Sequence, residues 1–276
     1  MTELATVAVA GATQSMIEHV IVPAVKAKMC RFILFSSDAL SCESQEVECR
    51  QSSNPESVVS DTVQAIVNKE ASVLMKGSIH TSAILREVLK KENGLRKEKV
   101  LSQVSVITLD DSGRQFIMTD PALNIQPDVS QKIAITKNAI EVAHKLGITQ
   151  PKAAILSSVE EVNPKMPSSV EAAEVAKYFE KNPLEATVEG PISMDIATDK
   201  SAAMIKNYQG AIKGDADILV VPGIDAGNLL YKAFTHFIPS TVSGAIVGAA
   251  VPVALSSRSD NAATKLASLK LAIQSR

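Results

Sequence analysis

The sequence of 276 residues contains few aromatic side chains and no tryptophan. Aromatic residues make up 3% of the chain, so we expect a core of aliphatic side chains and no stacking platform for single-stranded nucleic acid. The formal net charge is −2, without the basic excess that binding to a nucleic-acid backbone requires. These two absences argue against nucleic acid as a partner.

Long apolar runs and paired cysteines are also missing. No run approaches the roughly 18–20 apolar residues that cross a bilayer, and the N-terminal residues resemble a first strand more than a signal peptide. The cysteines are Cys30, Cys42 and Cys49, an odd number without metal-ligand grouping. We therefore expect reduced thiols, no metal site, no membrane partner and a cytoplasmic protein.

Short β-rich runs alternate with helical patterns along the chain. The predicted strands cover residues 4–10, 31–36, 72–76, 103–109, 115–119, 153–157, 217–222 and 245–255. The predicted helices cover residues 80–91, 129–146 with an N-cap at Asp128, a segment to about Phe179 that opens with a Ser168–Glu171 capping box, and a segment after Asp260. Residues 41–56 read as a surface loop or ragged edge element. This alternation predicts an α/β fold with ligands at the carboxyl ends of strands.

Three polar junctions join a predicted strand to a helix. The first runs from Lys76 to Thr81 as KGSIHT, the second from Pro222 to Asn228 as PGIDAGN, and the third from Ser256 to Asp260 as SSRSD. The start of a helix attracts anions because free backbone N–H groups and the helix dipole both point there. The alternative for each junction is structural: a surface Lys76 beside a capped helix, or helix caps at Asp225 and Asp260. Taken together, the junctions favour an enzyme that handles an anionic, phosphorylated small molecule.

The junction sequences also carry a resemblance to a known family. In order, the chain reads LMKGSIHTSAILREVL, MTDPALNIQPD, AILSSVEEVNPKMPSSVEAA, DADILVVPGIDAGNLLYK and VPVALSSRSD. Over about residues 70–276 it closely resembles the phosphate acetyl/butyryltransferase family, and the phosphate butyryltransferases and branched-chain phosphotransacylases within it. The first 70 residues match more loosely.

The resemblance implies a fold and a domain division. The family has two α/β domains with a cleft between them, in the class of isocitrate and isopropylmalate dehydrogenases. On this chain it implies one domain of residues 1–129 with 238–276 and another of residues 130–237. A homodimer or higher homo-oligomer is expected as well.

The resemblance further implies a reaction and residue roles. The enzyme would interconvert a short acyl-CoA plus phosphate with acyl phosphate plus CoA, with CoA as a substrate and no bound cofactor or metal. The family's Ser-Arg pair carries over to Ser257 and Arg258. Its base, an aspartate, would fall near Thr264, so Asp260 is the nearest acid and a weaker match. The remaining expected contacts are Lys76, Ser78, His80, Thr81, Asp225 and Asn228 for the substrate, and Arg86 and Arg96 for the phosphates of CoA.

Two other functions fit parts of the pattern. A metal-dependent hydroxyacid dehydrogenase would need a group of aspartates around a divalent ion, and the scattered aspartates form no such group. A non-catalytic acyl-CoA-binding protein on a transferase scaffold is favoured by the displaced aspartate and disfavoured by the intact Ser257-Arg258 pair. Metal-free, CoA-dependent turnover would exclude both.

Overall fold

The computed structural model describes residues 4–255 and 260–276. The chain forms two compact units: unit 1 comprises residues 1–99 and 243–276, and unit 2 comprises residues 100–242. Within the described residues, no helix is long and apolar enough to cross a membrane.

Unit 1 is built on a mainly parallel sheet. Its strands are β1 (Ala5–Ala10), β2 (Cys30–Ser36), β3 (Val47–Gln51), β4 (Val73–Lys76) and β11 (Val253–Leu255), together with β10 (Ser240–Val247), whose first residues belong to unit 2. The strand order is β3-β2-β1-β4-β11-β10, and only β10 and β11 pair antiparallel. Strands β1 and β4 are almost wholly buried, as expected for a parallel sheet covered on both faces.

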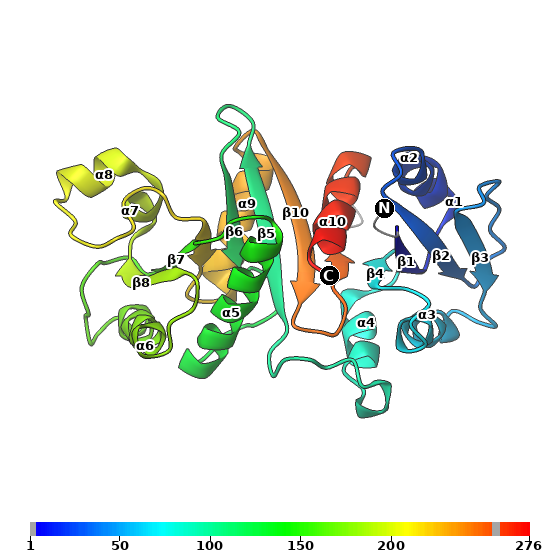
Figure 1. Ribbon diagram of the computed structural model, residues 1–276, viewed down its shortest axis with the longest axis horizontal. Coiled ribbons are helices and arrows are strands. Elements are labelled where there is room, and N and C mark those ends of the chain that lie inside the picture. Colours follow the sequence, from blue (N-terminus) through cyan, green and yellow to red (C-terminus); the bar gives the residue numbers. More distant parts are fainter. Residues whose placement is uncertain (1–3, 256–259) are drawn as a thin grey trace. The chain divides into compact units, whose positions relative to one another are not determined.

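Helices cover both faces of this sheet (Figure 1). One face carries α3 (Ser57–Val67) and α4 (Thr81–Val88), followed by the short helix η2 (Lys91–Asn93). The other face carries a continuous helical segment of α1 (Gln14–Met16), η1 (Ile17–Ile21) and α2 (Val22–Lys26), with α10 (Ala262–Gln274) packed against η1. The carboxyl ends of β1 and β4 therefore lead into helices on opposite faces, which opens space above the strand ends.

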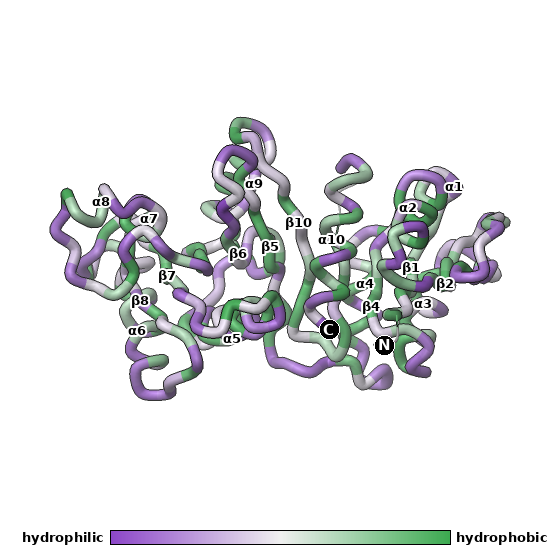
Figure 2. Tube along the Cα trace, turned by 45° about the horizontal axis from the view of Figure 1, so that its top comes forward, coloured by the Kyte–Doolittle hydropathy of each residue, from purple (hydrophilic) through white to green (hydrophobic). Residues whose placement is uncertain are grey.

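Unit 2 contains the five remaining strands of the 11-stranded sheet. Its strands are β5 (Ser102–Leu109), β6 (Gln115–Thr119), β7 (Lys152–Leu156), β8 (Thr187–Ile192) and β9 (Ile218–Val220), in the order β5-β6-β9-β7-β8. Only β5 and β6 pair antiparallel. In Figure 2 much of β5 and β10 has the hydrophobic colour, and most residues of both strands are buried.

Two helical layers enclose the sheet of unit 2. Helices α5 (Val129–Lys145) and α6 (Pro167–Lys181) pack on one face. Helices α7 (Met194–Thr198), α8 (Lys200–Ile205) and α9 (Ile224–His236) contribute to a core on the other face, where the rings of Phe116 and Phe234 meet edge to face at 5.3 Å. Alternate residues of β7 divide between the layers: Ile155 faces α6, and Leu156 joins the opposite core.

Most expected elements are confirmed. Asp128 is the N-cap of α5, and its side chain accepts from the Gln131 N–H in a capping box; Asn261 is the N-cap of α10. The polar segment 41–56 contains β3, which is an edge strand of the unit 1 sheet.

Two expectations were wrong. Residues 245–255 were predicted as one strand, but the chain reverses between β10 and β11, with Gly248 at φ 92° in the connection. A continuous apolar run hides such a reversal because both strands are buried. The Ser168–Glu171 capping box is also absent: the N-cap of α6 is Met166, two residues before Ser168, and the Ser168 hydroxyl instead contacts the Ser157 hydroxyl at 3.0 Å.

The division of the chain differs from the expected domains at residues 100–129. These residues carry β5 and β6, and β6 pairs with β9 inside unit 2. The division into one domain of residues 1–129 with 238–276 and another of residues 130–237 therefore stays a prediction.

Candidate functional site: a cationic pocket above two strand ends

The loops that follow β1 and β4 touch each other through two glycines. The Gly77 N–H donates to the Ala10 carbonyl at 2.9 Å, and the Ser78 N–H donates to the Gly11 carbonyl at 2.8 Å. A Cβ on Gly77 would lie 2.1 Å from the Gly11 oxygen, so no other residue fits there without moving the backbone. Gly11 itself adopts φ 74°, a conformation that favours glycine. The two glycines thus bring both strand-to-helix turns to one place.

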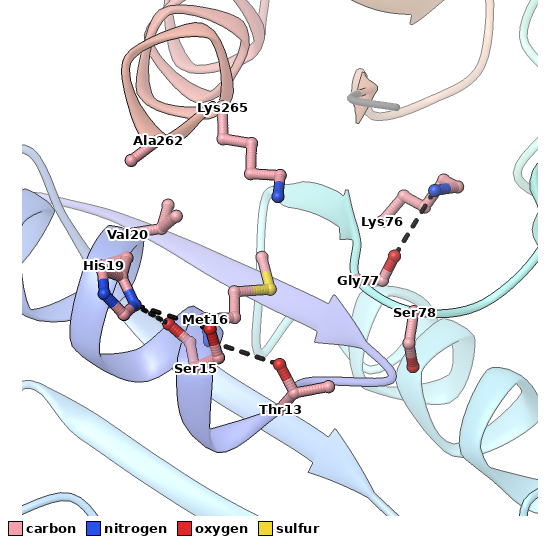
Figure 3. Close-up of a pocket in the computed structure, with 10 residues that line it drawn as sticks. All are labelled: Thr13, Ser15, Met16, His19, Val20, Lys76, Gly77, Ser78, Ala262 and Lys265. Atoms are coloured by element: carbon pink, nitrogen blue, oxygen red, sulfur yellow. Dashed lines mark hydrogen bonds between the residues drawn. The ribbon is translucent and has the colours of Figure 1, made fainter. Parts of the chain in front are cut away.

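A pocket of about 400 Å³ lies at this place, within unit 1. Figure 3 shows its lining, which comes from the β1–α1 turn and η1, from the end of β4, and from the first turn of α10. The lining residues are Thr13, Ser15, Met16, His19, Val20, Lys76, Gly77, Ser78, Ala262 and Lys265. Its volume falls in the range of about 300–1,000 Å³ that is typical of small-molecule sites.

The pocket lining is cationic. Lys76 is the last residue of β4, is 7% exposed, and its Nζ lies 3.4 Å from the Gly77 carbonyl. Lys265 extends its ammonium group into the pocket from α10 (Figure 3) and has no ion-pair partner among the described residues. None of the lining residues that the structure describes is acidic. Two ammonium groups at one pocket form an attractive environment for an anionic ligand.

The helical segment α1–η1–α2, which forms the pocket wall that follows β1, contains a π-helical turn. The Val22 N–H donates to the Ile17 carbonyl, a wide π-type bond, and the next residue is Pro23, which has no N–H to donate. Thr13 caps the segment by accepting the Met16 N–H at 3.2 Å. The His19 Nδ1 donates to the Ser15 carbonyl at 2.8 Å, which leaves Nε2 as the other ring nitrogen for a ligand.

The predicted residues of the first junction are only partly gathered in the pocket. Lys76 and Ser78 line it, and the Ser78 hydroxyl donates to the Gly11 carbonyl at 3.0 Å. His80 is the exposed N-cap of α4 and Thr81 is its first residue, and both lie outside the lining.

The third junction is described only from Asp260 onward. Asp260 is half-buried and directly precedes Asn261, which caps α10 by accepting the Thr264 N–H at 2.9 Å. The helix cap predicted for Asp260 is therefore supplied by its neighbour. Ser257 and Arg258 lie outside the described residues.

The other predicted contacts are dispersed. Arg86 is exposed on α4, and Arg96 is exposed and donates to the Lys99 carbonyl at 2.7 Å. Asp225 and Asn228 belong to unit 2, in the first turns of α9. Gly223 holds the cap position of α9 without a side-chain hydrogen bond, so the cap role considered for Asp225 is not present.

Sequence reasoning missed Thr13 and Lys265. The signal for Thr13 was available: a buried strand ends in Gly11-Ala12-Thr13, and a helical segment follows. Lys265 carried no local signal, because one lysine in the first turn of an amphipathic helix is ordinary. Its position in the pocket depends on the packing of α10 against η1.

A second pocket, in unit 2, differs in charge. It has a volume of about 660 Å³ and contains Lys206, which forms ion pairs at 3.0 Å with both Glu160 and Asp195. Hydrogen bonds from Ser193 and Lys206 lower the pKa of Asp195 to about 2. Because its lysine is already neutralised, this pocket suits an anion less well than the pocket of unit 1. No group of His, Cys, Asp and Glu side chains that could hold a metal occurs among the described residues.

Comparisons with known proteins show the family of the chain. Residues 16–273 match the sequence model of the family described as phosphate acetyl/butaryl transferase. The chain is 39% identical to a probable phosphate butyryltransferase of Bacillus subtilis, over 97% of this chain and 92% of that protein. It is 40% identical to the phosphate butyryltransferase of Clostridium acetobutylicum, over 76% of this chain and 70% of that protein.

Solved structures agree on the fold. A branched-chain phosphotransacylase from Enterococcus faecalis superposes with a TM-score of 0.93 and 42% identity, and the match covers 99% of each chain. A 4-hydroxythreonine-4-phosphate dehydrogenase from Burkholderia phymatum superposes with a TM-score of 0.58 at 11% identity, over 99% of each chain, and shares the fold alone. The predicted α/β class, like that of isocitrate and isopropylmalate dehydrogenases, is confirmed.

Proposed function

The chain belongs to the phosphate acetyl/butaryl transferase family, and from this premise we propose that it moves a short acyl group, butyryl or branched-chain, reversibly between CoA and inorganic phosphate. The observation that carries the proposal is the pocket of unit 1, where Lys76 and Lys265 provide positive charge. Phosphate and acyl phosphate are anions that such a pocket would hold. CoA acts as a substrate, and no bound cofactor is proposed.

The pocket supports a role in binding the phosphoryl group. Lys76 and Lys265 would contact its oxygens as point charges. The Thr13 hydroxyl, which accepts the Met16 N–H, can donate its proton to the same group, and Ser78, His80 and Thr81 are proposed contacts around the start of α4. Because Lys76 is buried, its charge is screened less by solvent than that of a surface lysine.

The chemistry toward acyl-CoA starts with the thiol of CoA. Its proton passes to a base, for which Asp260 is the proposed residue, and the thiolate sulfur forms a bond to the acyl carbonyl carbon. The carbonyl oxygen becomes an oxyanion, and the carbon–oxygen bond to phosphate then breaks, so phosphate leaves with the bonding electron pair. Ser257 is proposed to stabilise the oxyanion and Arg258 to hold the phosphate.

Other contacts and the assembly stay proposals from the resemblance. Arg86 and Arg96 would bind phosphates of CoA, and Asp225 and Asn228 would contact substrate. A homodimer in the cytoplasm is proposed as the working form, and the three unpaired cysteines, Cys30, Cys42 and Cys49, are compatible with that compartment.

The proposal is tested by thiol release from a panel of acyl-CoAs, with and without phosphate and with EDTA present. Phosphate-dependent release, fastest with butyryl-CoA or a branched acyl-CoA, is the expected result. In the same assay, Arg258→Ala should raise the KM for phosphate and lower kcat. A folded protein that releases no thiol from any acyl-CoA would reject the transferase and favour an acyl-CoA-binding protein.

A further inference from the structure

The pocket of unit 1 has two unlike sides. Its polar side is formed by Lys76, Gly77 and Ser78 at the end of β4, with Lys265 between the two sides. Its other side carries the aliphatic side chains of Met16, Val20 and Ala262 beside the polar residues Thr13, Ser15 and His19 (Figure 3). A pocket for phosphate alone would need only the polar side.

The apolar side chains are not all used in packing. Val20 is 1% exposed and belongs to the core, but Met16 and Ala262 are only half-buried and border the pocket. Met16 and Val20 are four residues apart in the helical segment and share one side of it. Ala262, at the first position of α10, continues this surface from a second helix. Together they offer an aliphatic surface to a ligand.

We propose that the acyl chain of the substrate lies against Met16, Val20 and Ala262, and that Met16 and Ala262 determine which chain lengths are accepted. This inference rests on the proposed function, because it names the acyl subsite of the same pocket. The acyl phosphate has an anionic end and an aliphatic end, and the pocket offers cations at one side and an apolar surface at the other. One ligand would satisfy both sides in one orientation.

Substitutions at Met16 and Ala262 should change the length of the acyl subsite in opposite directions. Met16 is unbranched and flexible, so its thioether fills space beside a short chain and can move for a branched one. Ala262 is small, and its methyl group leaves room that a larger side chain would fill. Shortening Met16 therefore lengthens the subsite, and enlarging Ala262 shortens it.

The experiment measures kcat/KM with acetyl-, butyryl-, isobutyryl- and hexanoyl-CoA at saturating phosphate. Met16→Ala removes three heavy atoms and should raise the hexanoyl-to-butyryl ratio by about tenfold or more, since one methylene in a hydrophobic pocket changes discrimination about 10–200-fold. Ala262→Leu should lower the butyryl-to-acetyl ratio by a similar factor. Met16→Leu, which nearly preserves the volume, should keep the wild-type profile.

The controls separate a subsite from a general effect on folding. Met204→Ala is a matched substitution at a methionine that is 74% exposed in unit 2, and it should leave the profile unchanged. If Ala262→Leu melts at a lower temperature than wild type, Ala262→Val is tested in its place. It should lower the butyryl-to-acetyl ratio by a smaller factor. A variant that lowers kcat/KM equally for every acyl chain would indicate a structural role only.

Three outcomes are decisive. The acyl subsite is supported if Met16→Ala shifts the preference toward longer acyl chains and Ala262→Leu shifts it toward shorter ones. Wild-type turnover with an unchanged chain-length profile in both variants overturns the subsite and leaves the transferase standing. A wild-type protein without phosphate-dependent thiol release overturns both.

Discussion

Replacing Gly77 with alanine should disrupt the pocket by separating two strand ends. The added Cβ would lie 2.1 Å from the Gly11 oxygen and 2.9 Å from the Ala10 oxygen, and both contacts are with backbone atoms that cannot rotate away. The backbone must therefore shift, and the hydrogen bonds from the N–H groups of Gly77 and Ser78 across to β1 must lengthen or break.

The cost follows from these two effects. Overpacking in a closely packed region costs about 1–3 kcal/mol, and each weakened hydrogen bond adds about 0.5–1.5 kcal/mol. Together these give an expected loss in the free energy of unfolding of about 2–6 kcal/mol. For a chain of this size, that should lower Tm by on the order of 10 °C.

The assay is thermal unfolding of the variant beside wild type and a matched glycine control. Gly94→Ala is the control, because Gly94 has φ 64° but no heavy atom within 4 Å of its added Cβ. That variant should lose only the roughly 1–2 kcal/mol that a left-handed conformation costs an alanine. If the Tm of Gly77→Ala is no lower than that of Gly94→Ala, the close approach of the two turns does not contribute to the free energy of unfolding as proposed.

Three further predictions concern charge. Lys265→Met should lower kcat/KM for phosphate about 10–100-fold, as expected when a charge-assisted contact of about 1.5–3 kcal/mol is lost. The control is Lys270→Met, at an exposed lysine of the same helix, which should leave kcat/KM for phosphate unchanged. Equal effects of the two substitutions would show that Lys265 does not contact phosphate. Asp260→Asn should lower kcat about 10²–10⁴-fold if Asp260 is the base, and near-wild-type turnover across pH would reject that role. Because hydrogen bonds from Ser193 and Lys206 lower the pKa of Asp195 to about 2, its stabilising contribution is present above its ordinary pKa of 3.8 and is lost as the pH falls toward 2; Asp195→Asn should therefore melt with a flatter dependence on pH over this range, and an unchanged acid limb would contradict the coupling.

Much of the local structure could be read from the sequence. Helix α5 follows from its apolar spacing and from the Asp128 capping box, because both act over a few residues. The buried strands β1 and β4 follow from continuous apolar runs, and the polar residues after β4 indicate a ligand-binding turn. The family, and with it the class of reaction, was carried by the same local motifs.

Features that depend on distant segments could not be read in this way. The reversal between β10 and β11 was missed because both strands are buried, and alternation of polar and apolar residues is then absent. The start of α6 was misplaced because Ser168 had the residue type of a cap, whereas Pro167 fixed the first turn. In the first case the local signal was absent, and in the second case the proline outweighed the serine.

The sequence by itself determined the α/β class and the family, since both depend on residues close together in the chain. Only the tertiary structure placed Lys265 and Ala262 of α10 opposite Met16 and Lys76 in one pocket. About 190 residues separate Lys76 from Lys265 in the sequence, and no periodicity links them. Their proximity follows from the pairing of β4 with β11 and the packing of α10 on η1, which are cooperative properties of the folded unit.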